Sequence, residues 1–190
     1  MSPTERPTER PTRPRGRTRE TVIAALFAAL LSASAWIVIP AGAVPVTLQV
    51  FIVLLAGLIL PTRLAATAVA SYLLVGAFGA PVFSGGGAGL AWILGPTGGY
   101  LFGFLVAAVL VAFVSGFLAQ QMPQMVADGI GVALGVVAIY AAGWIQLTLV
   151  TGMGWGAAFI AGVVPFIALD AAKAVVAVGV ASSLRRARVV

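Results

Sequence analysis

Residues 157–184 read AAFIAGVVPFIALDAAKAVVAVGVASSL, a long apolar run that carries one aspartate, Asp170, and one lysine, Lys173. The run is long enough to cross a bilayer, because a spanning helix needs about 20 predominantly apolar residues. The two charges are three positions apart, so a helix places them on one face, where they can neutralise each other and reach one ligand together. Ionisable residues at membrane depth are costly and usually functional. We therefore predict a pair that recognises a ligand, with a purely structural salt bridge as the alternative.

The composition of the whole chain is that of an integral membrane protein. Of its 190 residues, 61% are hydrophobic and 8% are charged, and the mean hydropathy is +1.11. The chain after residue 20 has room for about six spanning helices with short connections. We therefore predict an all-α, polytopic fold in a single membrane domain. The expected spans are Thr21 to Ile39, Thr47 to Leu60, Leu64 to Phe78, from near Gly95 to Leu118, Ile130 to Val150, and a last span after Pro165.

Charge gathers at the two ends of the chain. Residues 1–20 carry six arginines against three glutamates, and residues 184–190 carry three arginines. Because positive residues mark cytoplasmic segments, both ends are expected in the cytoplasm, which requires an even number of spans. The low-complexity tract 1–20 is predicted to be a disordered basic tail, with a secretory signal as the alternative. The membrane domain is then 21–184, followed by a basic cytoplasmic end at 185–190.

The missing residue types argue against most catalytic and metal chemistry. The chain has no cysteine and no histidine, so it lacks thiol nucleophiles, imidazole bases and the usual zinc and haem ligands. Its only lysine follows Ala171 and Ala172, whereas a phosphate-binding loop needs Gly-Lys-Ser/Thr. We expect no catalytic residue, no metal and no cofactor, so energy from a nucleotide must come from another protein. The net charge of +6 is explained by the basic cytoplasmic ends or by their contact with lipid headgroups, and no nucleic-acid partner is expected.

All four tryptophans fall toward the outer side of their predicted segments. They are Trp36, Trp92, Trp144 and Trp155. An aromatic belt should occupy both interfaces, so a one-sided arrangement favours aromatics that wall an outward-facing pocket, with a half-formed belt as the alternative. Pro165 is expected to divide the last apolar run, because proline removes a helical hydrogen bond and suits a first helical turn. Asp170 and Lys173 would then lie about one to two turns inside the outer surface.

Small residues mark one face of the first predicted span. Ala24, Ala25, Ala28 and Ala29 form two overlapping pairs at four-residue spacing, which permits close approach of another helix. This face either docks on a partner or packs within the molecule. Arg63 and Asp128 lie near the cytoplasmic ends of their predicted spans and are expected to be solvated.

Four segments together resemble a known family. They are VPVTLQ at Val44 to Gln49, GAPVFSGG at Gly79 to Gly86, LGPTGGYL at Leu94 to Leu101, and Pro165-Phe166 ahead of Asp170 and Lys173. In this order they are similar to the BioY family, the biotin-specific S components of energy-coupling-factor vitamin importers. The resemblance implies six membrane helices and biotin bound near the outer face by Asp170 and Lys173, under the loops after spans 1 and 3. It also implies that the small-residue face of span 1 docks on a transmembrane coupling subunit, which carries two ATPases.

The chemistry of biotin suits these residues. Its ureido ring offers N–H donors and a carbonyl acceptor, beside an apolar bicycle and an aliphatic acid tail. We predict that Asp170 accepts from a ureido N–H and that Lys173 donates to the ureido oxygen, with the tail carboxylate as the alternative partner of Lys173. Bonds of this charge-assisted kind are worth about 1.5 to 3 kcal/mol each. Further candidates are Phe83, Tyr100 and Trp144 against the rings and Thr47 and Gln49 as polar contacts, with helix packing or interface anchoring as the alternative for each. Gly85 and Gly86 are candidates in a loop that closes over the ligand.

The predicted function is that of a membrane-embedded subunit that captures biotin from outside and delivers it inward with a coupling subunit and ATPases. Such a chain is a multi-pass protein of the cell membrane and not an enzyme. One alternative is a solitary biotin carrier that works without ATPases. An alternative of another class is an intramembrane enzyme that uses Asp170 and Asp128 as a carboxylate dyad, although their predicted placement on opposite sides argues against it.

Overall fold

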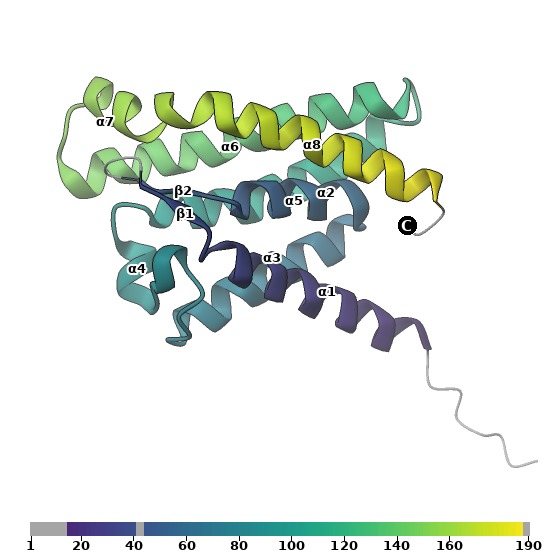
Figure 1. The fold of residues 1–190 in the computed structure, drawn as a ribbon, viewed down its shortest axis with the longest axis horizontal. Coiled ribbons are helices and arrows are strands. Elements are labelled where there is room, and N and C mark those ends of the chain that lie inside the picture. Colours follow the sequence, from purple (N-terminus) through teal and green to yellow (C-terminus); the bar gives the residue numbers. More distant parts are fainter. Residues whose placement is uncertain (1–14, 41–43, 188–190) are drawn as a thin grey trace, which may run out of the picture.

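The computed structural model describes residues 15–40 and 44–187, which form a bundle of helices (Figure 1). In chain order the elements are α1 (Arg15–Ser34), β1 (Val38–Ile39), β2 (Val46–Thr47), α2 (Gln49–Ile59), α3 (Thr62–Ala77), the 3-10 turn η1 (Ser84–Gly86), α4 (Leu90–Leu94), α5 (Gly98–Leu118), α6 (Gln124–Thr151), α7 (Trp155–Gly162), the 3-10 turn η2 (Val164–Phe166) and α8 (Ile167–Arg186). Three helical stretches of the described residues are long and apolar enough to cross a membrane: α5, α6, and α7 to α8 taken together. The helices α2 and α3 are apolar but shorter.

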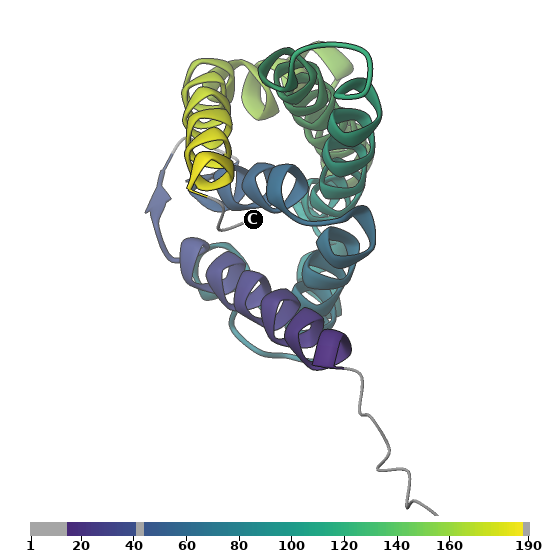
Figure 2. The ribbon, with the colours of Figure 1, turned by 90° about the vertical axis from the view of Figure 1, so that its right-hand side faces the viewer.

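The connecting elements divide the molecule into two ends. β1, β2, α4 and α7 lie at one end, which we call the loop end (Figure 1). The start of α1 and the last turn of α8 lie at the opposite end, which we call the terminal end. Viewed from the terminal end, α1 lies beside α3, and α2 lies next to α8 (Figure 2). The helix α2 also packs on α5, so it lies between α5 and α8.

The helices α5 and α6 pack closely because glycines leave room between them. A Cβ at Gly103 of α5 would lie 2.8 Å from the Cα of Ile139 in α6, and one at Gly135 of α6 would lie 2.6 Å from the Cγ2 of Val111 in α5. Small residues allow helix backbones to approach in this way. The close contact holds α5 and α6 together, and both helices line a cavity at the loop end.

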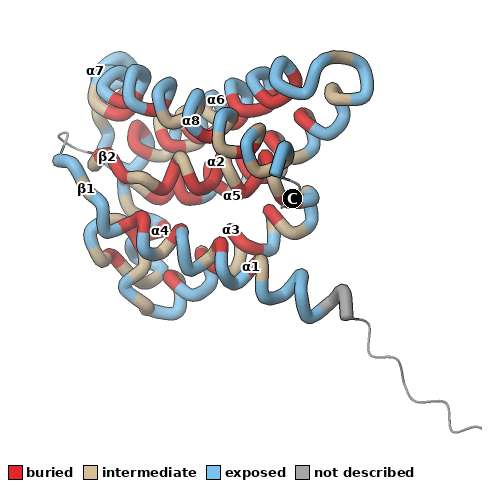
Figure 3. The backbone as a smooth tube through the Cα atoms, turned by 45° about the vertical axis from the view of Figure 1, so that its right-hand side comes forward, coloured by how far each residue is buried: buried red, intermediate tan, exposed pale blue. Residues whose placement is uncertain are grey.

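The exterior of the bundle is apolar as well as its core. Buried positions gather in the middle of the molecule around α2 and α5, and exposed positions follow the outward faces of the helices (Figure 3). Many of those exposed positions carry large hydrophobic side chains, including Leu26, Phe113, Val137, Leu149 and Val175. Exposed apolar surface of this extent suits contact with lipid rather than with water.

The helix bounds differ from the predicted spans mainly in α1 and α6. The helix α1 begins at Arg15, inside the tract expected to be disordered, and the rest of that tract, 1–14, lies outside the described residues. It ends at Ser34 rather than Ile39, because Val38–Ile39 pairs with Val46–Thr47 in a short antiparallel ladder that the all-α prediction did not include. The helix α6 begins at Gln124, directly after Pro123, where a proline suits a helix start.

The predicted break at Pro165 is confirmed. The last apolar run is divided into α7, the 3-10 turn η2 that contains Pro165, and α8, which begins at Ile167. Asp170 therefore lies in the first turn of α8. This break brings the aspartate toward the loop end, where Lys173 of the same helix contacts Thr47 in the connection between α1 and α2.

Candidate functional site

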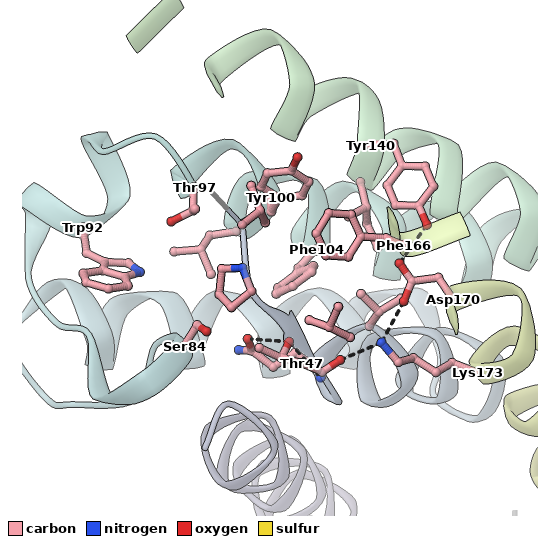
Figure 4. Close-up of a pocket in the computed structure, with 17 residues that line it drawn as sticks. Thr47, Ser84, Trp92, Thr97, Tyr100, Phe104, Tyr140, Phe166, Asp170 and Lys173 are labelled. Atoms are coloured by element: carbon pink, nitrogen blue, oxygen red, sulfur yellow. Dashed lines mark hydrogen bonds and ion pairs between the residues drawn. The ribbon is translucent and has the colours of Figure 1, made fainter. Parts of the chain in front are cut away.

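A cavity at the loop end brings together residues from distant parts of the chain (Figure 4). Its volume is about 60 Å³, several times the space that one water molecule needs. The apolar wall includes Val46, Leu101, Phe104, Ile139 and Phe166. Polar groups stand at two opposite ends, with Asp170, Lys173 and Tyr140 at one and Ser84 and Thr97 at the other (Figure 4).

Asp170 and Lys173 form an ion pair that lines this cavity, and we call them the cavity pair. The Nζ of Lys173 lies 2.8 Å from Asp170 Oδ1 and 2.7 Å from the main-chain oxygen of Thr47. The other carboxylate oxygen, Oδ2, accepts a hydrogen bond of 2.8 Å from the hydroxyl of Tyr140 on α6. Asp170 is only 2% exposed, and a charge buried to this degree needs such partners. A carboxylate has about four acceptor positions, so two donors leave Asp170 able to accept more.

Thr47 and Gln49, two of the predicted ligand contacts, also line the cavity, but their side chains bond mainly to each other and to α3. The hydroxyl of Thr47 donates to Gln49 Oε1 at 3.1 Å. The Gln49 side-chain amide donates to the hydroxyl of Tyr72. These bonds fix the strand β2 and the start of α2, which holds the Thr47 carbonyl in front of Lys173. The contribution of Thr47 to the cavity pair thus comes from its main chain.

Tyr100, from the LGPTGGYL segment, presents its ring to the cavity and uses its hydroxyl elsewhere. The hydroxyl donates to the carbonyl of Gly162 at 2.6 Å, which ties the start of α5 to the end of α7. The ring packs on Gly143 of α6, where any side chain would collide with it. Tyr100 therefore shapes the wall and also holds three helices together.

Ser84, Thr97 and Tyr140 are polar cavity residues that the sequence did not single out. Within the described part of the chain, the Ser84 hydroxyl is the one buried side-chain polar atom without a hydrogen-bond partner. Such groups are costly in a folded protein and are usually explained by a ligand or a water. Ser84 could have been found from its place in the GAPVFSGG segment, whereas nothing in the sequence connects Tyr140 with Asp170.

Four of the predicted contact residues do not line the cavity, because each is used in packing nearby. Phe83 is fully buried, with its ring edge against Tyr72 at a centroid distance of 5.5 Å. The amide of Gly85 donates to the carbonyl of Ala35, and Gly86 has a positive φ of 84° next to the Trp36 ring. Trp144 donates from Nε1 to the carbonyl of Trp155 at 2.9 Å. These residues support the loops and helices around the cavity.

The tryptophans lie at the loop end, but only Trp92 of the four lines the cavity. Trp36 and Trp155 are exposed, and Trp144 packs edge to face on Trp155 and Phe159. The prediction that all four wall a pocket is wrong for these three. The exposure of Trp36 and Trp155 at one end of an apolar bundle is typical of anchors at a membrane interface.

The four alanines of α1 divide between inward and outward positions. Ala24 is buried and Ala28 half-buried, whereas Ala25 and Ala29 are exposed. All four line a groove between α1 and α3 that also includes Tyr72. Packing within the molecule therefore uses part of this small-residue face, and its docking on a partner stays a prediction.

Asp128 is not solvated, contrary to the prediction. It is 1% exposed and forms an ion pair with Arg185 of α8, whereas Arg63 is exposed as expected. The positions of Asp170 and Arg185 are 15 residues apart on one helix, or about 22 Å at 1.5 Å per residue. Asp128 bonds at the far end of α8 from Asp170, so the two carboxylates cannot form a catalytic dyad. Among the described residues there is also no group of three or more acidic side chains that could hold a metal ion.

Comparisons with known proteins agree with this geometry. A sequence model described as the BioY family matches residues 6–189. A probable biotin transporter BioY of Pyrococcus horikoshii is 40% identical over 156 residues, which are 82% of this chain and 90% of that protein. A biotin transporter BioY of Thermotoga maritima is 42% identical over 163 residues, which are 84% and 92%. The crystal structure of the S-component for biotin from an ECF-type ABC transporter superposes with a TM-score of 0.84 at 27% identity, covering 92% of this chain and 95% of that one.

Proposed function

This chain belongs to the BioY family, and from that premise we propose that it is the substrate-binding subunit of a biotin importer. Its function is biotin uptake, and it is a multi-pass protein of the plasma membrane rather than an enzyme. The observation that carries the proposal is the buried carboxylate of Asp170, which faces an apolar cavity with acceptor positions to spare. A ureido ring supplies the N–H donors that such a carboxylate needs.

The two polar ends of the cavity favour one orientation of biotin. In this orientation Asp170 accepts from a ureido N–H, and Lys173 donates to the ureido oxygen. The apolar bicycle then lies against Phe104 and Phe166, and the acid tail points toward the unpartnered hydroxyl of Ser84. This arrangement gives one ureido N–H, the ureido oxygen and the acid tail a partner each, and it leaves Ser84 satisfied. The reverse orientation, with the tail carboxylate at Lys173, leaves Asp170 without a matching donor.

The decisive experiment is a binding titration of the purified protein with biotin, desthiobiotin and biotin methyl ester. We expect saturable binding of biotin and of desthiobiotin, which keeps the ureido ring. The methyl ester should bind only a few-fold more weakly, because the Ser84 hydroxyl can still donate to an ester oxygen, although less strongly than to a carboxylate. A large loss with the methyl ester would place the tail at Lys173, and no saturable binding of biotin would contradict the function itself.

We further propose six membrane crossings, by α1, α2, α3, α5, α6 and α8, with both chain ends in the cytoplasm. The location of the first turn of α1 and the last turn of α8 at one end of the bundle supports an even number. The arginines near both chain ends support the cytoplasmic side. A cysteine introduced at Ser183, near the terminal end, should react with a membrane-impermeant thiol reagent only after the cells are opened. Labelling of intact cells would reverse this orientation.

We also propose that the exposed alanines of α1 and the groove between α1 and α3 dock on a transmembrane coupling subunit linked to ATPases. The support is the small-residue groove together with the resemblance to an S-component of an ECF-type transporter. Replacing Ala25 and Ala29 by leucine should prevent co-purification with the coupling subunit and leave biotin binding intact. Full uptake by this chain alone, in cells that lack coupling subunits, would instead favour a solitary carrier.

A further inference from the structure

Tyr140 approaches the carboxylate of Asp170 from a different helix than Lys173 does. Its hydroxyl, on α6, donates to Oδ2 at 2.8 Å, whereas Lys173, on α8, holds Oδ1 at 2.8 Å. Figure 4 shows the carboxylate between these two partners at one end of the cavity. Asp170 is therefore fixed at two points that belong to two separate elements.

The second point matters because the last torsion of an aspartate side chain is soft. Torsions of this type have broad energy wells, so a single anchor leaves the plane of the carboxylate free to turn. Lys173 is a weak orienting partner, because its ammonium group sits on a flexible stem and its three donors rotate. A phenol on a rigid ring defines one direction, so Tyr140 fixes the plane. The remaining acceptor positions of Asp170 then keep a constant direction.

The ring of Tyr140 has a second task at the same place. It lines the cavity, and it also lines an apolar groove of about 630 Å³ that runs between α6 and α8. The other residues of that groove include Ala133, Val136 and Ala171, which carry no polar side-chain atom. The hydrogen bond to Asp170 thus keeps the ring where it separates a polar site from an apolar surface.

We propose that Tyr140 is a positioning residue for the ligand, which orients Asp170 so that its free acceptor positions meet a ureido N–H. The inference rests on the proposed function and deepens it, since recognition of this N–H then depends on two residues, Asp170 and Tyr140, rather than on one. Tyr140 thereby sets how strongly the site discriminates against ligands whose ureido nitrogen carries a substituent.

The test compares Tyr140→Phe with Tyr100→Phe, which removes a hydroxyl from another cavity tyrosine that does not contact Asp170. Dissociation constants are measured for biotin, desthiobiotin and a biotin methylated on the ureido nitrogens. Tyr140→Phe should weaken biotin and desthiobiotin by about tenfold, the usual effect of one hydrogen bond to a charged group. It should weaken binding of the methylated ligand less, so the ratio between the dissociation constants of the methylated ligand and biotin falls. Tyr100→Phe should leave the ratio between biotin and the methylated ligand unchanged.

A double-mutant cycle with Asp170→Ala, which removes both acceptor oxygens, separates positioning from general packing. If Tyr140 acts through Asp170, adding Tyr140→Phe to Asp170→Ala should change biotin affinity by less than about twofold. If the double variant loses affinity by the product of the two single losses, the inference is overturned. It is also overturned if Tyr140→Phe discriminates between biotin and the methylated ligand as strongly as the parent does. Should Tyr140→Phe fail to fold, Tyr140→His, which keeps a ring donor, must discriminate better than Tyr140→Leu. A parent protein that does not bind biotin contradicts the proposed function, whereas a binding parent with unchanged discrimination in the variants contradicts this inference alone.

Discussion

Two buried carboxylates in this molecule pair with cations on the same helix, α8, but at its opposite ends. Asp170 and Lys173 form the cavity pair at the loop end, and Asp128 and Arg185 form what we call the terminal pair at the other end. Asp170 accepts from two described donors, Lys173 and Tyr140. Asp128 accepts four hydrogen bonds, two from Arg185 and one each from Ser115 and Gln124.

The difference lies in acceptor capacity, and it separates a binding site from a structural one. A carboxylate has about four acceptor positions, so the protein itself fills those of Asp128 and leaves about half of those of Asp170. Arg185 in addition donates to the carbonyl of Leu58 at the end of α2, which links three helices. An isolated charge in an apolar sequence is thus a sign of function only when its partners leave it unsaturated.

Arg185→Ala should have the largest effect, and on stability rather than on binding. It leaves Asp128 buried without its cation, and breaking such a pair costs about 3 kcal/mol or more. Thermal or denaturant unfolding in detergent should show the loss, whereas the folded fraction should bind biotin with the parental affinity. A variant that keeps its stability but loses biotin would make the terminal pair part of the binding site.

Asp170→Asn should show the converse pattern. The amide keeps the shape of the side chain but loses the charge, so biotin affinity should fall by about 30-fold, or about 2 kcal/mol. Isothermal titration of the purified protein measures this change, and the unfolding temperature serves as the control for folding. Parental affinity in a folded Asp170→Asn variant would reduce the cavity pair to a salt bridge that only ties α8 to its neighbours.

Ser115→Ala tests whether the four acceptor positions of Asp128 are really in use. Removing one of several donors should lower the free energy of unfolding by about 1 kcal/mol, less than the loss of Arg185. Ser183→Ala, at an exposed serine on α8 that donates to the helix carbonyl of Gly179, is the matched control and should change little. Equal stability of the two variants would mean that Asp128 is less saturated than its contacts indicate.

Ser84→Ala should have the smallest effect and concerns the other end of the cavity. The free protein should be as stable as the parent or slightly more stable, because a buried hydroxyl without a partner is removed. Biotin should bind about two- to fivefold more weakly, within the net worth of about 0.5 to 1 kcal/mol for one hydrogen bond. A competition titration between biotin and its methyl ester measures this change in affinity. A loss of biotin affinity as large as that in Asp170→Asn would mean that the Ser84 end, and not the Asp170 end, binds the ureido ring.

Much of this fold could be predicted from the sequence where the signal is local. The apolar runs predict the main helices, Pro165 predicts the break before α8, and the spacing of Asp170 and Lys173 predicts their contact. The start of α1 at Arg15 was missed because a low-complexity arginine tract resembles a disordered tail. A ladder as short as Val38–Ile39 with Val46–Thr47 gives no periodic signal.

The parts that could not be predicted depend on contacts between distant residues. Asp128 and Arg185 are 57 positions apart and Tyr140 and Asp170 are 30 apart, so no spacing rule relates them. Phe83 and Trp144 were assigned to the ligand because large aromatics are frequent in binding sites. The same property makes them useful in packing, and only the fold decides between the two uses.

The contact between Lys173 and the main-chain oxygen of Thr47 has a consequence for how this site tolerates genetic change. Every amino acid supplies the same carbonyl, so no single substitution at position 47 deletes this anchor of the lysine. A saturation library should therefore accept at position 47 those side chains that keep β2 and the start of α2 in place, while position 173 stays intolerant. One of the two hydrogen bonds of Lys173 therefore goes to a main-chain atom that no substitution at position 47 removes.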